Sequence, residues 1–306
     1  MTDAARTGHT DIRRGDWVDR WLPAVARPYA RLARLDRPIG TWLLLFPCWW
    51  STALATDGWP SVWWMALFAI GAVVMRGAGC TVNDILDRDF DGKVERTRHR
   101  PIPSGQVTVT GALAFLLLQL LLGLAVLLQF PWTAIGLGCL SLVLVFTYPL
   151  MKRITWWPQF FLGLAFNWGA LMGWTAVHGT LGWPAVMLYV AGIAWTLGYD
   201  TIYAHQDKSD DALIGVKSSA RRLGSASRPW VGGFYAVTVA GLVAAGLSAD
   251  LHPVFLLGIA AAAVQMGWQV ARWRIDDPAD CLVMFKSNRW TGWLVLAAFV
   301  AGNVVG

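Results

Sequence analysis

Two acidic stretches stand where apolar segments of the chain end. The first covers residues 83–91 and reads NDILDRDFD, with Asn83, Asp87 and Asp91 spaced four residues apart. If a helix continues through them, these three side chains share one face, and Asp84 lies at its edge. Their carboxylate and amide oxygens are suitable ligands for a hard cation such as Mg²⁺. Taken alone, such a stretch is usually a solvated loop between membrane helices.

The second acidic stretch, residues 200–211, reads DTIYAHQDKSDD. Asp207 and Asp211 are again four apart, and Asp200 lies seven before Asp207, on the same face of a continuous helix. Asp207 and Asp211 each follow their counterparts in the first stretch by 120 residues. Two such pairs, each followed by bases and a glycine, favour a functional site over a plain loop. The pattern predicts two acidic rows arranged around two metal ions.

Basic and polar side chains near these stretches could hold a polyanion such as diphosphate, which often completes the ligand shell of Mg²⁺. Tyr148 and Lys152 lie four apart in TYPLMKR and could grip a departing diphosphate, although Lys152 and Arg153 could equally mark membrane topology. Arg76 lies inside an apolar segment and needs a polar partner. Asn167 is a mid-segment amide that an interhelical hydrogen bond would also explain. The bases flanking the acids are Arg88, Lys93, Arg96, Arg98, Arg100, Lys208 and Lys217.

The composition is that of an integral membrane protein, because 56% of the 306 residues are hydrophobic and 14% are charged. We expect an all-α fold of nine transmembrane helices, each near the ~20 residues that a crossing needs. No GxSxG, P-loop or HExxH pattern occurs, so hydrolase and nucleotide-driven pump functions lack support. The expected spans are 38–56, 61–82, 108–129, 132–150, 158–177, 184–204, 230–248, 252–271 and 288–305.

The distribution of basic residues predicts the orientation in the membrane. Alternate connections, at 57–60, 130–131, 178–183 and 249–251, contain no Lys or Arg, and the 25 basic residues group around the others. The positive-inside rule therefore places both acidic stretches and the N-terminus in the cytoplasm, and the C-terminus outside.

Residues 1–37 form a separate cytoplasmic segment ahead of the membrane domain at 38–306. They lack the apolar core of a signal peptide, and their scattered acids argue against a transit peptide. Residues 17–35 alternate apolar and basic side chains, which fits either a short interfacial helix or a disordered lead.

These motifs resemble those of a known family. NDILDRDFD is similar to the NDxxDxxxD signature of the UbiA superfamily of intramembrane prenyltransferases, residues 200–211 resemble its second aspartate motif, and YPLMK resembles its YxxxK motif. RTRHRPIPSG and YDTIYAHQDKSDDALIGVKS look most like the bacterial 4-hydroxybenzoate polyprenyltransferases of ubiquinone synthesis. The resemblance covers roughly residues 30 to 300, without a departure at the motif positions.

The resemblance implies a nine-helix bundle around a central cavity, in a bacterial inner (cytoplasmic) membrane, without an obligate protein partner. Two Mg²⁺ ions would bridge the diphosphate of a polyprenyl diphosphate donor, and 4-hydroxybenzoate would be prenylated ortho to its hydroxyl. The first ion would be held by Asn83, Asp84, Asp87 and Asp91, and the second by Asp207 and Asp211. The diphosphate would be held by Tyr148, Lys152 and Arg153, with Lys93, Arg96, Arg100 and Lys208 as helpers. Candidates to bind the acceptor are Arg76 and Asn167, and either Asp200 or Asp207 would take up the proton.

Alternatives remain within and outside this family. Homogentisate, dihydroxynaphthoate or haem could replace 4-hydroxybenzoate as the acceptor. A secondary transporter with an acid-lined cation path is a different class, but transporters usually place such groups near the middle of the membrane. The acids of this chain cluster at one predicted face, which favours the enzyme.

Overall fold

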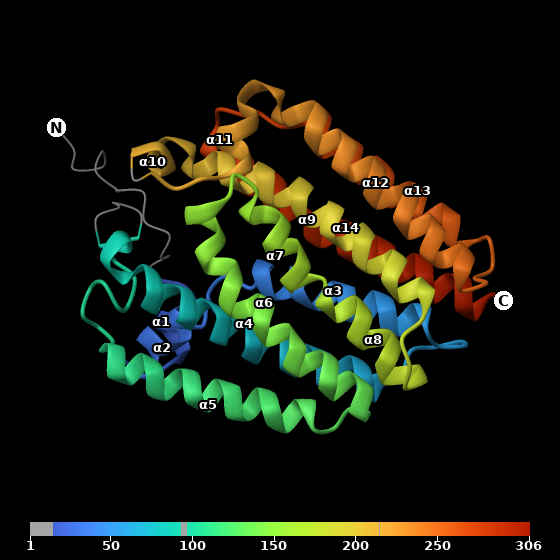
Figure 1. Ribbon diagram of the computed structural model, residues 1–306, viewed down its shortest axis with the longest axis horizontal. Helices are drawn as coiled ribbons and strands as arrows, with labels where there is room; N and C mark the ends of the chain where they lie inside the picture. Colours follow the sequence, from blue (N-terminus) through green and yellow to red (C-terminus); the bar gives the residue numbers. More distant parts are fainter. Residues whose placement is uncertain (1–14, 93–96, 214) are drawn as a thin grey trace. The chain divides into compact units, whose positions relative to one another are not determined.

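The structure is a computed structural model that describes residues 15–92, 97–213 and 215–306, and all regular structure in these residues is helical (Figure 1). The predicted all-α fold is therefore confirmed. Each predicted span coincides with helix, namely α3 (Ile39–Leu54), α4 (Val62–Asp91), α5 (Val109–Leu127), α6 (Trp132–Ile154), α7 (Pro158–Phe166) with α8 (Trp168–His178), α9 (Trp183–Ala204), α12 (Ser227–Ser248), α13 (Phe255–Arg272) and α14 (Pro278–Val304).

Within the described residues, six helical segments are long and apolar enough to cross a membrane. They are α4, α5, α6, the α7–α8 pair, α9 with the turn that follows it, and the segment Ser219–Ser248 that contains α12. α3 is also apolar but has only 16 residues. A membrane fold is thus supported, whereas nine crossings and the sides of the two termini stay predictions.

Two helices depart from the predicted limits. α4 continues past the predicted end at residue 82 and stops only at Asp91, so the first acidic stretch is helical. The fifth predicted span is instead divided at Asn167, whose Nδ2 donates to the carbonyl oxygen of Gly163 at 2.8 Å. Asn side chains compete with the helical backbone for such bonds, which explains a break at this residue.

The described residues form two compact units, one within the ranges 1–40 and 71–126 and the other within the ranges 41–70 and 127–306. In the first unit, α2 (Arg27–Leu32) contributes Leu32 to a core with Ile102, Val107 and Ala112. In the second unit, α9 packs against α7, α8, α12 and α14. Trp195 of α9 is fully buried there and donates its ring N–H to Asn288 Oδ1 of α14 at 2.9 Å.

The segment before α3 begins with α1 (Trp17–Trp21), which is capped by the side chain of Asp16. Val18 is buried, whereas Trp21 and Val25 are 81% and 82% exposed. This pattern is that of a short helix with one face on the protein and aromatic and aliphatic side chains outside. At Asp19, the hydrogen bond from the Gly15 amide, together with Arg31, holds the pKa of the carboxyl below its usual value.

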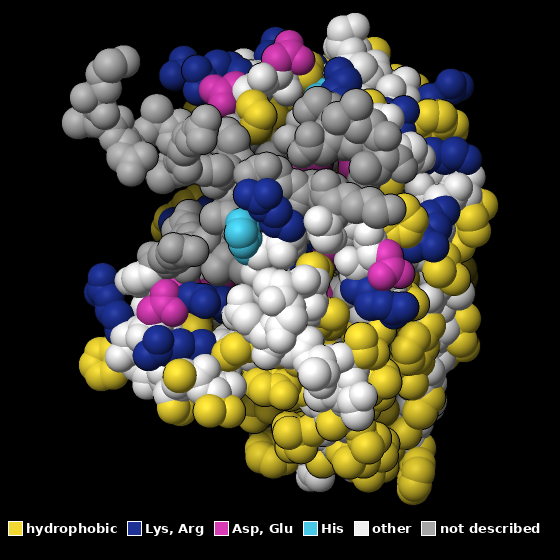
Figure 2. All heavy atoms as spheres, turned by 90° about the vertical axis from the view of Figure 1, so that its left-hand side faces the viewer, with side chains coloured by type: hydrophobic (Ala, Val, Ile, Leu, Met, Phe, Trp, Pro, Cys, Tyr) yellow, Lys and Arg dark blue, Asp and Glu magenta, His cyan; other side chains and the backbone are white. Residues whose placement is uncertain are grey.

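Charged and apolar side chains separate on the face drawn in Figure 2. Lys and Arg side chains lie mostly in its upper and middle parts, and hydrophobic side chains cover most of its lower part. This segregation is expected where charged helix ends adjoin apolar flanks.

Candidate active site

The first acidic motif lies on the last turns of α4. Because α4 is continuous to Asp91, Asn83, Asp87 and Asp91 share one helical face, as their spacing predicts. Asp84, Asp87 and Asp91 are only 0%, 4% and 8% exposed. Carboxylates that are buried to this extent require positive partners or strong hydrogen bonds.

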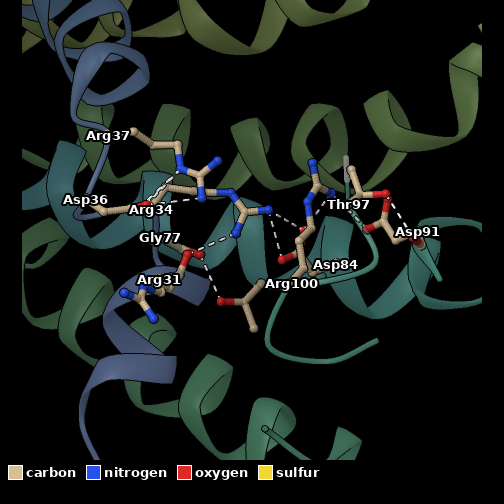
Figure 3. A network of polar contacts seen from close by, with 10 residues as sticks. Arg31, Arg34, Asp36, Arg37, Gly77, Asp84, Asp91, Thr97 and Arg100 are labelled. Atoms are coloured by element: carbon tan, nitrogen blue, oxygen red, sulfur yellow. Dashed lines mark hydrogen bonds and ion pairs between the residues drawn. The ribbon is translucent and has the colours of Figure 1, made fainter. Parts of the chain in front are cut away.

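Two arginines contact Asp84 (Figure 3). Nη2 of Arg34 lies 2.7 Å from Oδ1 and 2.9 Å from Oδ2 of Asp84. Nη1 of Arg100 lies 3.3 Å from the same Oδ1 and 2.8 Å from Oδ2 of Asp91. Arg100 therefore links two carboxylates that stand almost two helical turns apart on α4.

The backbone turn that follows α2 places the Arg34 side chain beside Asp84. Arg34 has a φ of +58°, in the left-handed region that a residue other than glycine seldom adopts. The Leu35 amide donates to the Ala30 carbonyl at 3.0 Å, which closes the helix end. The Arg34 side chain also donates to the Arg31 carbonyl at 2.9 Å. A strained backbone of this kind persists when its surroundings fix it, and the buried contact with Asp84 supplies such a constraint.

The connection after α4 returns Arg100 to the motif. Thr97 donates its hydroxyl to the carbonyl oxygen of Asp91 at 2.9 Å, and the Arg100 amide donates to the Thr97 carbonyl at 2.9 Å. Lys93 and Arg96, two of the bases predicted to hold diphosphate, lie outside the described residues. Arg100 belongs to the same predicted set, and its guanidinium lies beside Asp84 and Asp91.

The second acidic motif spans a change of helix type. α9 ends at Ala204, a 3₁₀ turn η1 covers His205–Asp207, and α10 covers Lys208–Leu213. A 3₁₀ turn advances by about 20° more per residue than an α-helix, so three such residues rotate the chain by about 60°. Asp200 and Asp207 are then offset by about 40° around the chain axis, where a continuous α-helix would give about 20°. An offset of about 40° is also that of residues four apart in an α-helix, so the two still share a face. Asp200, Asp207 and Asp211 are all half-buried.

Within the second unit, the chain after this motif is fastened to the end of α6. The amide of Lys217 donates to the Lys152 carbonyl at 3.0 Å, and Nζ of Lys217 donates to the Ile154 carbonyl at 3.1 Å. Since Lys152 also belongs to the YPLMK motif, a main-chain hydrogen bond joins that motif to the segment that follows the second acidic motif. Tyr148 and Lys152 are half-buried, and Arg153 is exposed.

Arg221 fixes the same loop from the next helix, α11 (Ser219–Leu223). Its Nη1 donates to the carbonyl oxygens of Asp211, at 3.2 Å, and of Val216. The guanidinium carbon lies 5.4 Å from the centre of the Trp156 ring, within the range of a cation–π contact. Sequence reasoning missed both Arg221 and Arg34 as site residues, because their contacts depend on tertiary structure.

The two candidate acceptor ligands lie in different surroundings. Arg76 on α4 packs against Gly40, where an added Cβ would lie 2.5 Å from the Arg76 Nε. Asn167 is fully buried, and its Nδ2 donates to Thr196 Oγ1 at 2.8 Å as well as to Gly163. The amide of Asn167 thus makes the interhelical hydrogen bond that was the alternative explanation for it.

The chemistry of the donor set tests whether the first motif fits a metal ion. Within the described parts of the chain, no three His, Cys, Asp or Glu side chains form a group that could hold a metal by themselves. Mg²⁺ usually needs one or two carboxylates and completes its shell with phosphate and water. The face with Asn83, Asp87 and Asp91 offers such oxygens. Asp84 fits poorly, because arginines contact both of its oxygens.

Comparison with known proteins identifies the family. The UbiA prenyltransferase family matches residues 44–293. The chain belongs to this family. The mitochondrial 4-hydroxybenzoate polyprenyltransferase of Arabidopsis thaliana is 51% identical over 98% of this chain and 75% of its own length. The mitochondrial 4-hydroxybenzoate polyprenyltransferase of Aedes aegypti is 50% identical over 92% of this chain and 64% of its own length.

Solved structures show the same fold. A UbiA homolog from Aeropyrum pernix, in its apo form, matches with a TM-score of 0.72 and 23% identity, over 85% of this chain and 97% of that one. A UbiA homolog from Archaeoglobus fulgidus, bound to GPP and Mg²⁺, matches with a TM-score of 0.65 and 17% identity, over 91% of this chain and 100% of that one.

These matches confirm the predicted family, its prenyltransferase class and the resemblance to the 4-hydroxybenzoate branch. The predicted location in a bacterial inner membrane is wrong, because the matching relatives are mitochondrial enzymes of eukaryotes. The error has a physical reason. The distribution of Lys and Arg reports which side of a membrane a loop occupies, and it carries no information about which membrane that is.

Proposed function

We propose that this UbiA-family enzyme transfers a polyprenyl group from polyprenyl diphosphate to 4-hydroxybenzoate, at the ring carbon ortho to the hydroxyl, and releases diphosphate. The observation that carries the proposal is the identity of 51% over nearly the whole chain to a relative named for this reaction. The GPP and Mg²⁺ bound by the Archaeoglobus fulgidus homolog support a prenyl diphosphate donor and a divalent metal. Ubiquinone synthesis is the pathway that this product would serve.

The metal ligands proposed are Asn83, Asp87 and Asp91 for one Mg²⁺, and Asp207 and Asp211 for a second. When bound, Mg²⁺ would act as a Lewis acid that neutralises the charge of the departing diphosphate. The first set lies at the end of the apolar helix α4 and the second set follows the end of the apolar helix α9, where carboxylates are less costly than at the middle of a bilayer.

The remaining chemistry falls to side chains of the chain itself. Tyr148, Lys152 and Arg153 donate to diphosphate oxygens while the allylic C–O bond breaks and its electron pair leaves with the diphosphate. Arg100 donates in the same way from the first motif. The ring carbon then forms the new C–C bond, and the ring proton passes to a carboxylate, that of Asp200 or Asp207.

Arg76 is the stronger of the two candidates for binding the acceptor. A guanidinium can hold the benzoate carboxylate through two parallel hydrogen bonds. The Nδ2 of Asn167 is engaged with Gly163 and Thr196, which favours a structural function for that amide. A homogentisate or naphthoate acceptor remains the second candidate, since both also carry carboxylates.

The proposal can be tested with the purified protein in lipid nanodiscs. We expect 4-hydroxybenzoate and a polyprenyl diphosphate to give a prenylated acid with Mg²⁺ and none with EDTA, as measured by mass spectrometry. Asp87→Ala and Asp207→Ala should remain folded and lose turnover. Product from homogentisate but not from 4-hydroxybenzoate would overturn the acceptor assignment. No product from any aromatic acceptor would overturn the reaction itself.

A further inference from the structure

We infer that Asp84, although it stands in the first acidic motif, is a positioning residue and not a metal ligand. Its carboxylate, on α4, holds the side chains of Arg34 and Arg100 and so places the guanidinium of Arg100 beside Asp91. The inference rests on the proposed function, because it divides the predicted ligands of the first Mg²⁺ into those that bind it and one that does not. It concerns the first unit alone.

The contacts of Asp84 leave little room for a cation. Its side chain is 0% exposed, and the Arg34 side chain that faces it is only 9% exposed. Oδ2 accepts from Arg34 at 2.9 Å, while Oδ1 accepts from Arg34 at 2.7 Å and from Arg100 at 3.3 Å. Both oxygens of the carboxylate therefore already accept from positively charged donors.

Electrostatics argues against replacing these donors with Mg²⁺. A divalent ion at the Asp84 oxygens would meet two guanidinium groups at contact distance, and the repulsion between buried like charges is weakly screened. It would also separate Arg34 from a buried carboxylate, and breaking a buried ion pair is strongly destabilising. Substrate phosphate or water can complete the ligand shell of Mg²⁺ more easily than the Asp84 carboxylate can.

Asp91 differs from Asp84 in its arginine contacts and in its exposure. It accepts from Arg100 through Oδ2 at 2.8 Å, and its side chain is 12% exposed. It also lies almost two helical turns beyond Asp84, at the end of α4. Metal binding at the end of α4 leaves the contact between Arg34 and Asp84 intact.

The contacts of Asp84 also explain how Arg100 is aimed. Three separate segments meet at this carboxylate, namely the end of α2 through Arg34, α4 itself, and the connection after α4 through Arg100. With Arg34 compensating Asp84, the guanidinium of Arg100 is shared with Asp91 on the proposed metal-binding face. Arg100 is thereby held where it can meet a diphosphate oxygen.

The experiment compares Asp84→Asn with Asp87→Asn, a matched variant on the same helix. Mn²⁺ binding at saturating inorganic diphosphate is followed by EPR, and unfolding in detergent gives an apparent Tm. The Asp87→Asn variant should bind Mn²⁺ about tenfold or more weakly. The Asp84→Asn variant should bind Mn²⁺ with an affinity within about twofold of the wild type and should have a lower apparent Tm. It should raise the KM for prenyl diphosphate more than it lowers kcat.

A double variant guards against a simple folding failure. Arg34→Met combined with Asp84→Leu removes both charges of the buried pair, so the Tm should recover relative to Asp84→Asn. This variant should also bind Mn²⁺ like the wild type. The KM change separates positioning from a purely structural function, because a structural contact alone would lower the Tm and leave the KM for prenyl diphosphate unchanged.

Three results would contradict these expectations, and each points to a different error. Weaker Mn²⁺ binding in the double variant and in Asp84→Asn, by as much as in Asp87→Asn, would make Asp84 a ligand and overturn the inference. An unchanged KM in Asp84→Asn would overturn the positioning of Arg100. Unchanged Mn²⁺ binding in Asp87→Asn would instead overturn the metal site of the proposed function, and the inference with it.

Discussion

Replacing Arg221 with Met should loosen the loop that follows the second acidic motif. The guanidinium of Arg221 donates to two main-chain carbonyls of that loop, those of Asp211 and Val216. It also lies over the ring of Trp156. Met has a similar length and is apolar, so the variant removes the hydrogen bonds and the charge while it keeps much of the packing.

The magnitude follows from these contacts. A hydrogen bond from a charged donor contributes about 1.5–3 kcal/mol, and a partly exposed cation–π contact about 0.5–1 kcal/mol. The lower ends sum to about 3.5 kcal/mol for two hydrogen bonds and one cation–π contact. Because Arg221 and Trp156 are partly exposed, we discount this sum for solvent screening to about 2 kcal/mol. At 1.4 kcal/mol for each factor of ten, the loop should open about 30 times more often.

Hydrogen–deuterium exchange measures this opening directly. The amide of Val216 donates to the Asp211 carbonyl and that of Lys217 to the Lys152 carbonyl, each at 3.0 Å. Both amides should exchange about 30-fold faster in Arg221→Met. The matched control is Arg222→Met on the same helix, whose side chain is exposed, and it should change exchange by less than about threefold. Equal exchange in the two variants would refute the assignment of Arg221 as the residue that fixes this loop.

Three further substitutions test other contacts. Gly173→Val should lower the free energy of unfolding by about 1–3 kcal/mol, seen as a lower apparent Tm, because a Cβ there would lie 2.6 Å from the Cys48 carbonyl oxygen. The control is Gly136→Val, since an added Cβ at Gly136 has nothing within 4 Å. Gly40→Ala should displace the Arg76 guanidinium and raise the KM for 4-hydroxybenzoate about fivefold with the KM for the donor unchanged. A spin label on Trp21→Cys in liposomes should be quenched more by oxygen than by a water-soluble nickel chelate, as an interfacial helix requires.

The helical framework follows largely from local sequence. Apolar runs of membrane-spanning length predicted where helices lie. The four-residue spacing of Asn83, Asp87 and Asp91 is consistent with the helix through the first motif, which extends past the predicted end of the span at residue 82. The break at Asn167 was not predicted. It depends on a side chain that bonds to its own helix and to Thr196, which is 29 residues away in sequence.

The partners of the first motif also escape sequence reasoning. Arg34 lies 50 residues from Asp84, among other arginines that look equivalent in the sequence. Only the left-handed turn at Arg34 and the burial of α2 bring its guanidinium to α4. In the second motif, the sequence does not show the 3₁₀ turn at His205–Asp207, which changes the offset between Asp200 and Asp207 to about 40°.

The two motifs are positioned by different means, and this decides how their variants should be interpreted. In the first motif the carboxylate of Asp84 is itself the partner of Arg34, so changing that carboxylate also changes how the chain packs. In the second motif Arg221 binds the main-chain carbonyl of Asp211, which survives any substitution of the side chain. Loss of turnover in Asp211→Asn therefore reports on chemistry at the carboxylate, provided that exchange at Val216 stays slow. Loss of turnover in Asp84→Asn has to be divided between folding and catalysis before it says anything about metal binding.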